Sequence, residues 1–140
     1  MLLSWIGLNL MIKSIDHIVL TAQDIEQTIS FYCDVLGMQL EAFSPPDGSP
    51  ERQALKFGNQ KINLHDAQAP YIPHAKTPIP GSLDLCFLSE VSVQQWITVF
   101  AKHKISIENG PVQKTGATGP LMSVYVRDPD GNLIEISNQL

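Results

Sequence analysis

The stretch IDHIVLTAQDIEQTISFYCDVLG (15–37) joins two different hydrophobic periodicities and decides the fold. Its first part, IDHIVLTA (15–22), alternates and is rich in β-branched residues, which is typical of a strand. Its second part predicts a helix over 24–37, because Asp24 and Gln27 form a capping-box pattern and Gly37 stands where a helix would end. The stretch is therefore a strand followed directly by an amphipathic helix.

The same order of elements occurs twice along the chain. After the first helix we expect a strand at 38–43 and a hairpin around Asn59-Gln60, formed by ALKFG and KINLH. A segment rich in proline, 68–81, then reads as an extended linker. Beyond it we expect a strand at 82–88, a helix capped by Ser92 and Gln95, strands at 105–108, 121–126 and 132–137, and a glycine-rich loop at 108–120.

These elements predict an α+β fold made of two βαβββ modules. The modules span 12–67 and 82–138, the linker 68–81 joins them, and 12–140 form one domain behind an apolar extension, 1–11. A half of this size could hardly bury its own sheet face, so the two sheets, or two chains, must cooperate.

Composition narrows the class of protein. The net charge of −5 argues against a nucleic-acid partner, which requires a basic face. The apolar first residues are too short to span a bilayer and lack the basic region of a signal peptide, so we expect no stable membrane insertion. Cys33 and Cys86 do not form a disulfide scaffold, which favours a reducing, cytoplasmic location, and we expect both to fill core space.

Several polar side chains share the sheet face that no helix covers. Side chains alternate along a strand, so when Ile18 and Leu20 pack under the helix, His17 points away from it. The same argument, applied to the other strands, exposes His65, Glu135, and Asp84 or Ser82. Two imidazoles and a carboxylate can hold a divalent metal and leave positions open for substrate. The alternative is that these residues are ordinary solvated polar groups.

The two ends of the domain resemble a known superfamily. IDHIVLTAQDIEQTISFYCDVLGM and the closing RDPDGNLIEIS resemble the vicinal-oxygen-chelate superfamily, which includes glyoxalase I, extradiol dioxygenases and bleomycin-binding proteins. ALKFGNQKINLHD and PGSLDLCF resemble the glyoxalase-domain-containing-protein-5 group within it. The resemblance implies that the two modules form a cupped mixed sheet with the helices on its outer face.

The resemblance also implies a site. His17 falls at the first-strand metal ligand, and Glu135 falls at the last-strand carboxylate ligand. His65 falls at the end of the first module's last strand, where glyoxalase I uses a glutamate. The family motif has Gly-His where this chain has Gly81-Ser82, so either Asp84 replaces the missing histidine or the site keeps three ligands and a water. Glu135, and after it Asp84, would be the catalytic carboxylates, with Zn, Ni, Mn or Fe as the metal.

Three functions remain open at this stage. The first is a glyoxalase-like, metal-dependent lyase or isomerase acting on a small oxygen-rich molecule. The second is a non-haem Fe(II) dioxygenase, because two histidines and one carboxylate also suit iron. The third is a metal-free protein that binds an antibiotic-like molecule. The resemblance further implies a homodimer. Arg52, Lys56, Lys114 and Arg127 could recognise an anionic arm of the substrate or could be solvated surface charges.

Overall fold

The computed structural model describes residues 11–140, and most of the expected extension 1–11 lies outside the described residues. In chain order the elements are β1 (His17–Ala22), α2 (Ile25–Ile29), η1 (Ser30–Val35), β2 (Gln39–Phe43), β3 (Arg52–Phe57), β4 (Gln60–Asp66), β5 (Asp84–Leu88), α3 (Val93–Lys102), β6 (Asn109–Thr115), β7 (Pro120–Arg127) and β8 (Leu133–Gln139). In the described part of the chain, no helix is long and apolar enough to cross a membrane.

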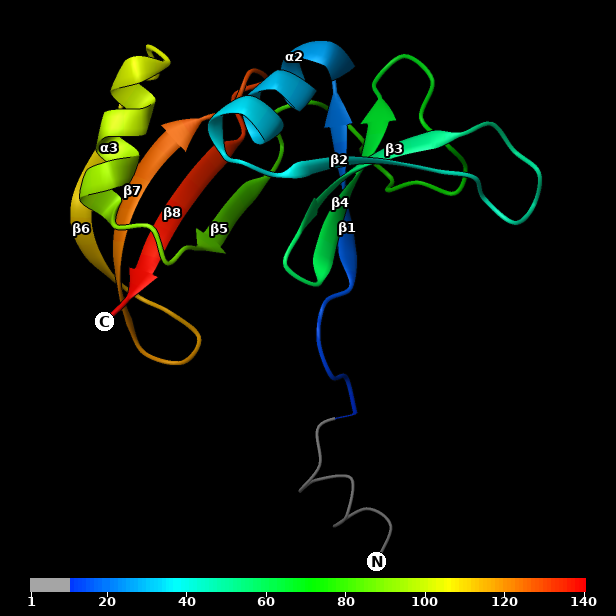
Figure 1. Cartoon of the computed structure of the whole chain (residues 1–140). Helices are drawn as coiled ribbons and strands as arrows, with labels where there is room; N and C mark the ends of the chain where they lie inside the picture. Colours follow the sequence, from blue (N-terminus) through cyan, green and yellow to red (C-terminus); the bar gives the residue numbers. More distant parts are fainter. Residues whose placement is uncertain (1–10) are drawn as a thin grey trace, which may run out of the picture.

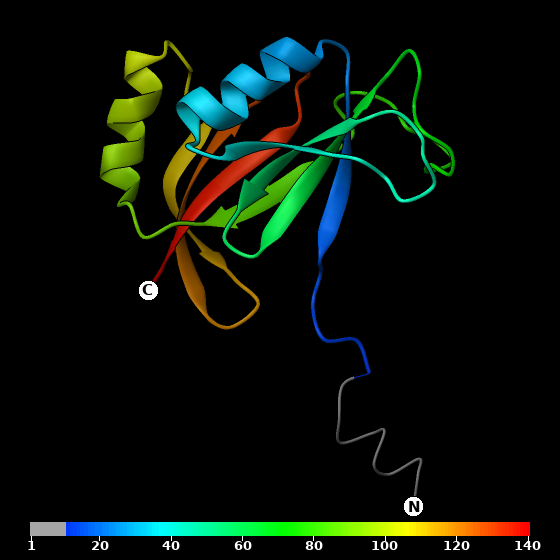
Figure 2. The same cartoon turned by 45° about the vertical axis from the view of Figure 1, so that its right-hand side comes forward.

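The strands form two sheets with the same topology, which confirms the α+β fold of two βαβββ modules. Sheet A has the order β1-β4-β3-β2 and sheet B the order β5-β8-β7-β6. In each sheet the first strand runs parallel to the last, and the other neighbours are antiparallel. The sheets stand side by side, with the helices gathered on one side of them (Figure 1; Figure 2 turns the view by 45°).

The two helices begin where the capping patterns place them. Asp24 accepts a hydrogen bond from the Gln27 amide, and Ser92 and Gln95 form a reciprocal capping box at the start of α3. The first helix is not regular along its length, because α-helical turns at Ile25–Ile29 give way to a π-helix over Ser30–Val35. It is followed by Gly37, whose φ of +80° only glycine adopts freely.

One predicted strand was wrong. Residues 105–108 have no strand structure, and the strand instead occupies Asn109–Thr115, within the segment expected to be a loop. Pro111 is tolerated there because β6 is the outer strand of sheet B, where a missing N–H breaks no ladder. The pairing of β6 with β7 also shifts register between Asn109 and Val112, next to Gly110.

The apolar faces of both sheets meet the helices, as the alternation predicted. Leu20 and Ile62 in sheet A and Ile134 in sheet B are fully buried in one core that includes Phe100 of α3. The modules also touch directly, since the rings of Phe57 and Phe87 meet edge to face at 5.3 Å. Packing of the helix side leaves the opposite, open face of each sheet for polar residues.

Candidate functional site

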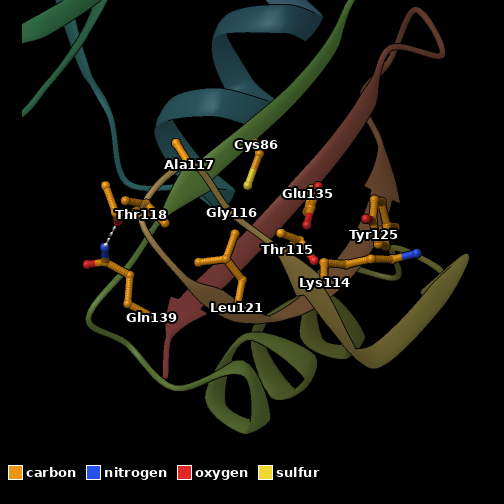
Figure 3. A pocket seen from close by; sticks show the side chains of 11 residues that line it. Cys86, Lys114, Thr115, Gly116, Ala117, Thr118, Leu121, Tyr125, Glu135 and Gln139 are labelled. Atoms are coloured by element: carbon orange, nitrogen blue, oxygen red, sulfur yellow. Dashed lines mark hydrogen bonds between the residues drawn. The ribbon is translucent and has the colours of Figure 1, made fainter.

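The open face of sheet B carries a cavity of about 640 Å³. Strands β5, β7 and β8 form its floor, and the β6–β7 loop forms one wall (Figure 3). A cavity of this size is in the range that holds a small organic ligand. Its lining residues include Cys86, Leu88, Lys114, Leu121, Tyr125 and Glu135.

Glu135 is held in this cavity by a chain of hydroxyl groups. Its Oε2 accepts a hydrogen bond of 3.3 Å from the Oγ of Ser137, two residues along β8. The Ser137 hydroxyl in turn lies 2.7 Å from the Oγ of Ser123 and 3.2 Å from the Sγ of Cys86. Ser123 and Ser137 are fully buried, so they fix the carboxylate from below.

Tyr125 stands beside Glu135 on the neighbouring strand. The two residues are register partners between β7 and β8, and Figure 3 shows Glu135 between Cys86 and Tyr125. Burial, followed by the nearby Glu135 carboxylate, raises the pKa of Tyr125 to about 12. The phenol therefore keeps its proton at neutral pH and offers a donor next to a carboxylate.

Cys86 does not fill core space, so that expectation was wrong. The residue is exposed and lines the cavity, because it shares the strand face of Asp84 rather than that of Leu85 and Phe87, which are partly buried against the core. Partial burial of the thiol, followed by the acidic neighbours, raises the pKa of Cys86. A protonated thiol is a poor nucleophile, so the arrangement favours a lining role over covalent chemistry. The alternation of SLDLCFL contained the signal for this position.

His17 approaches the same region from sheet A. It is the first residue of β1, and its Nδ1 lies 2.9 Å from Oδ2 of Asp16. A second cavity of about 140 Å³ is lined jointly by His17 and by Cys86 and Phe87 of β5. Cys86, the register partner of Glu135, therefore lines both this cavity and the larger one that holds Glu135.

His65 lies elsewhere, on the open face of sheet A. Only 5% of its surface is exposed, because the ring of Tyr71 packs against it perpendicularly at 5.2 Å. Burial lowers the pKa of His65 below its ordinary value. Within residues 11–140 of one chain, no three His, Cys, Asp or Glu side chains come together as a metal-binding group. In the single chain, His17 and Glu135 line two different cavities that share Cys86, and His65 lines neither of them.

The strand registers show which positions of the two modules correspond. In sheet A, His17 and Val19 of β1 pair with Lys61 and Asn63 of β4. In sheet B, Asp84 and Cys86 of β5 pair with Leu133 and Glu135 of β8. Asp84 therefore corresponds to His17, and Asn63 corresponds to Glu135.

On this comparison, two of the positions assigned from the sequence move by two residues each. Ser82 precedes β5, is exposed, and donates its hydroxyl hydrogen to the carbonyl oxygen of Ile79 at 2.8 Å. Asp84, the first residue of β5, takes the position in module two that His17 has in module one. His65, two residues beyond Asn63, corresponds to Ser137. The sequence placed Asn63 on the open face of its strand. Its equivalence to Glu135 was missed because that comparison requires the strand register of the second module.

Comparisons with known proteins agree with this architecture. Residues 14–136 match the Glyoxalase/Bleomycin resistance protein/Dioxygenase superfamily. Virulence protein STM3117 of Salmonella typhimurium is 48% identical over 94% of this chain and 88% of its own length. Its crystal structure superposes with a TM-score of 0.84, covering 94% of this chain and all of that one.

Two further relatives extend the range of similarity. Glyoxalase domain-containing protein RDO1 of Mycosarcoma maydis is 46% identical over 93% of this chain and 70% of its own length. The crystal structure of lactoylglutathione lyase from Agrobacterium tumefaciens has 30% identity and a TM-score of 0.66, covering 91% of this chain and 95% of that one. The paired βαβββ modules, their open polar faces and these similarities lead to one conclusion: the chain belongs to the glyoxalase/bleomycin resistance protein/dioxygenase superfamily.

Proposed function

We propose that this protein is a metal-dependent lyase or isomerase that acts on a small oxygen-rich substrate. The observation that carries the proposal is the carboxylate of Glu135, which is fixed by Ser137 at the wall of the 640 Å³ cavity and stands beside the protonated Tyr125. The similarity to a lactoylglutathione lyase supports this reaction class.

The proposed ligands of the metal are His17, Glu135 and His65. Imidazole nitrogens and a carboxylate suit Zn, Ni, Mn or Fe. Cys86 lines both the cavity of Glu135 and the cavity of His17, whereas His65 lines neither, so within one chain the three donors do not come together on one ion. We therefore propose that a second copy of the chain supplies His65, which makes a homodimer part of the proposal.

Each residue of the proposed site has a separate role in the reaction. A bound divalent metal would act as a Lewis acid on neighbouring substrate oxygens. Glu135 would take a proton from one substrate carbon and return it to the adjacent one. Ser137 would keep that carboxylate oriented, and the phenol of Tyr125 would donate a hydrogen bond to developing negative charge. Asp84, two residues from Cys86 on the same strand face, is the second candidate carboxylate.

The test is the activity of Glu135→Gln in the presence of excess divalent metal. The substrate is the hemithioacetal of methylglyoxal and glutathione, followed by related hemithioacetals. We expect the variant to lose about 100-fold or more in kcat, because an amide cannot accept the proton. Glu90→Gln, an exposed carboxylate outside the cavity, is the matched control and should keep wild-type activity. Full activity of Glu135→Gln would refute the assignment.

A second function is favoured by the lining of the cavity. Leu88, Leu121 and Tyr125 supply apolar surface beside the single carboxylate, which suits a protein that holds a ligand without transforming it. Isothermal titration in the presence of a chelator separates the two functions. A ligand that binds equally well with and without metal, and is recovered unchanged, would favour the binding protein.

A further inference from the structure

Three buried polar atoms without hydrogen-bond partners gather at one place in sheet A. They are Nδ1 of His65, Oδ1 of Asn63 and Nε of Arg52. Asn63 and His65 point to the same face of β4. Asn63 pairs with Ala54 of β3, and Arg52 and His65 are each two residues further along their strands from this pair. An unpaired buried polar atom costs about 1–3 kcal/mol, so three neighbours of this kind call for a common partner.

The charge of Arg52 indicates the sign of that partner. The chain contains two arginines. The guanidinium of Arg127 forms an ion pair with Glu108 at 3.0 Å, whereas that of Arg52 has no ion pair with any carboxylate among residues 11–140. Arg52 instead lies over the ring of Tyr71, 4.0 Å from its centroid. A half-buried guanidinium stacked on an aromatic ring is oriented but not neutralised.

Tyr71 links this arginine to His65. Its ring has Arg52 over one face and meets the His65 ring edge to face at 5.2 Å. The tyrosine comes from the segment between β4 and β5, where residues 67–83 form turns and bends only. One side chain from this segment therefore covers both donors.

We infer that Arg52, His65 and Asn63 form a subsite for an anionic oxygen group, either a carboxylate or a phosphate, that also carries a hydroxyl. The N–H groups of Arg52 and His65 would donate to the anionic oxygens, and Oδ1 of Asn63 would accept the hydroxyl hydrogen. His65 would donate to the anion through Nδ1, so its Nε2 remains available to bind the metal. The inference rests on the proposed function in one respect: the anion is taken to be one arm of the substrate.

The test uses inorganic phosphate and glycolate as probes, with chloride at matched ionic strength as the reference. The full chain is titrated with each probe, with and without a chelator, and the imidazole signals of its four histidines are followed by NMR. We expect saturable shifts of His65 and none of His103, which is exposed at the end of α3. Shifts of His65 with phosphate alone would indicate a phosphate group, and shifts with glycolate alone would indicate a carboxylate. Shifts with neither probe would overturn the inference.

Variants test the role of the guanidinium. Arg52→Gln should weaken binding of the effective probe by about tenfold or more, because a charge-assisted hydrogen bond is lost. Arg52→Lys keeps the charge without the fork geometry, so its affinity for the probe should lie between those of the wild type and Arg52→Gln. Arg127→Gln is the matched control and should bind as the wild type does. Equal binding by Arg52→Gln and wild type would contradict the inference. Because the titrations also run in chelator, this failure is separate from a failure of metal binding.

Discussion

At the scale of single residues, one buried hydrogen bond ties the two modules together. The hydroxyl of Tyr32, in the π-helix after β1, donates to Oδ2 of Asp128 at 2.8 Å. Asp128 follows β7 and also accepts hydrogen bonds from Asn132 and Asp130, so the carboxylate organises the turn before β8. Because Glu135 is on β8, this turn helps to set the strand that carries the candidate base.

The first prediction concerns this bond. Tyr32→Phe should lower the free energy of unfolding by about 1–3 kcal/mol, because Asp128 is buried and loses a charge-assisted donor. Urea unfolding followed by circular dichroism measures the change. Tyr125→Phe removes a hydroxyl from the half-buried cavity wall and should have a smaller effect. Equal stability of Tyr32→Phe and wild type would contradict this account of the turn.

The second prediction concerns the pH dependence of stability. Burial lowers the pKa of His65 in the folded chain below the value of about 6.5 expected when unfolded. Below that value the unfolded chain binds more protons than the folded one, so stability falls as pH decreases. We expect wild type to lose more stability than His65→Gln between about pH 7 and about pH 5. His103→Gln should follow the wild type. Parallel curves for wild type and His65→Gln would show that the imidazole is not buried.

At the scale of elements, local sequence predicted the features that depend on strict backbone geometry. The helix N-caps, the hairpin of β3 and β4 and the apolar faces of the strands were all predictable, because each depends on near neighbours in sequence. The strand β6 was not, since Pro111 and Gly110 are loop signals and only the outer position in sheet B makes a strand there possible.

The third prediction concerns the capping box of α3. Ser92→Ala should cost about 1 kcal/mol of stability, because the hydroxyl accepts a hydrogen bond from the Gln95 amide that water would replace only in part. Thermal and urea unfolding measure the loss. Ser106→Ala, at an exposed position outside the helix, is the control and should be neutral. A neutral Ser92→Ala would mean that packing on β7 and β8 alone fixes the start of α3.

At the scale of the whole molecule, the duplicated sheets explain how far the site was predictable. Alternation along each strand assigned His17, His65, Asp84 and Glu135 to the open faces. It gave no information about distances along or between the sheets, so it could not show that His65 lines neither of the cavities that His17 and Glu135 line. The place of Tyr125 beside Glu135 could not be predicted either, because it depends on the pairing of β7 with β8.

The fourth prediction tests whether two copies share each site. His65→Ala and Glu135→Gln chains are co-expressed in equal amounts with different tags. In mixed dimers, one site would combine an intact Glu135 with the partner's intact imidazole and the other would carry both changes. Random pairing should then restore about one quarter of the wild-type metal content, although each variant alone has none. No recovery in isolated mixed dimers would show that chains do not share ligands.

The most direct test of the central claim is the metal content of the purified chain. Elemental analysis would be made on protein prepared without an affinity metal, for wild type, His65→Ala and the control His103→Ala. The account predicts close to one divalent ion per chain in wild type and His103→Ala, and loss of the ion in His65→Ala. Wild-type protein that takes up no Zn, Ni, Mn or Fe even after soaking would contradict it.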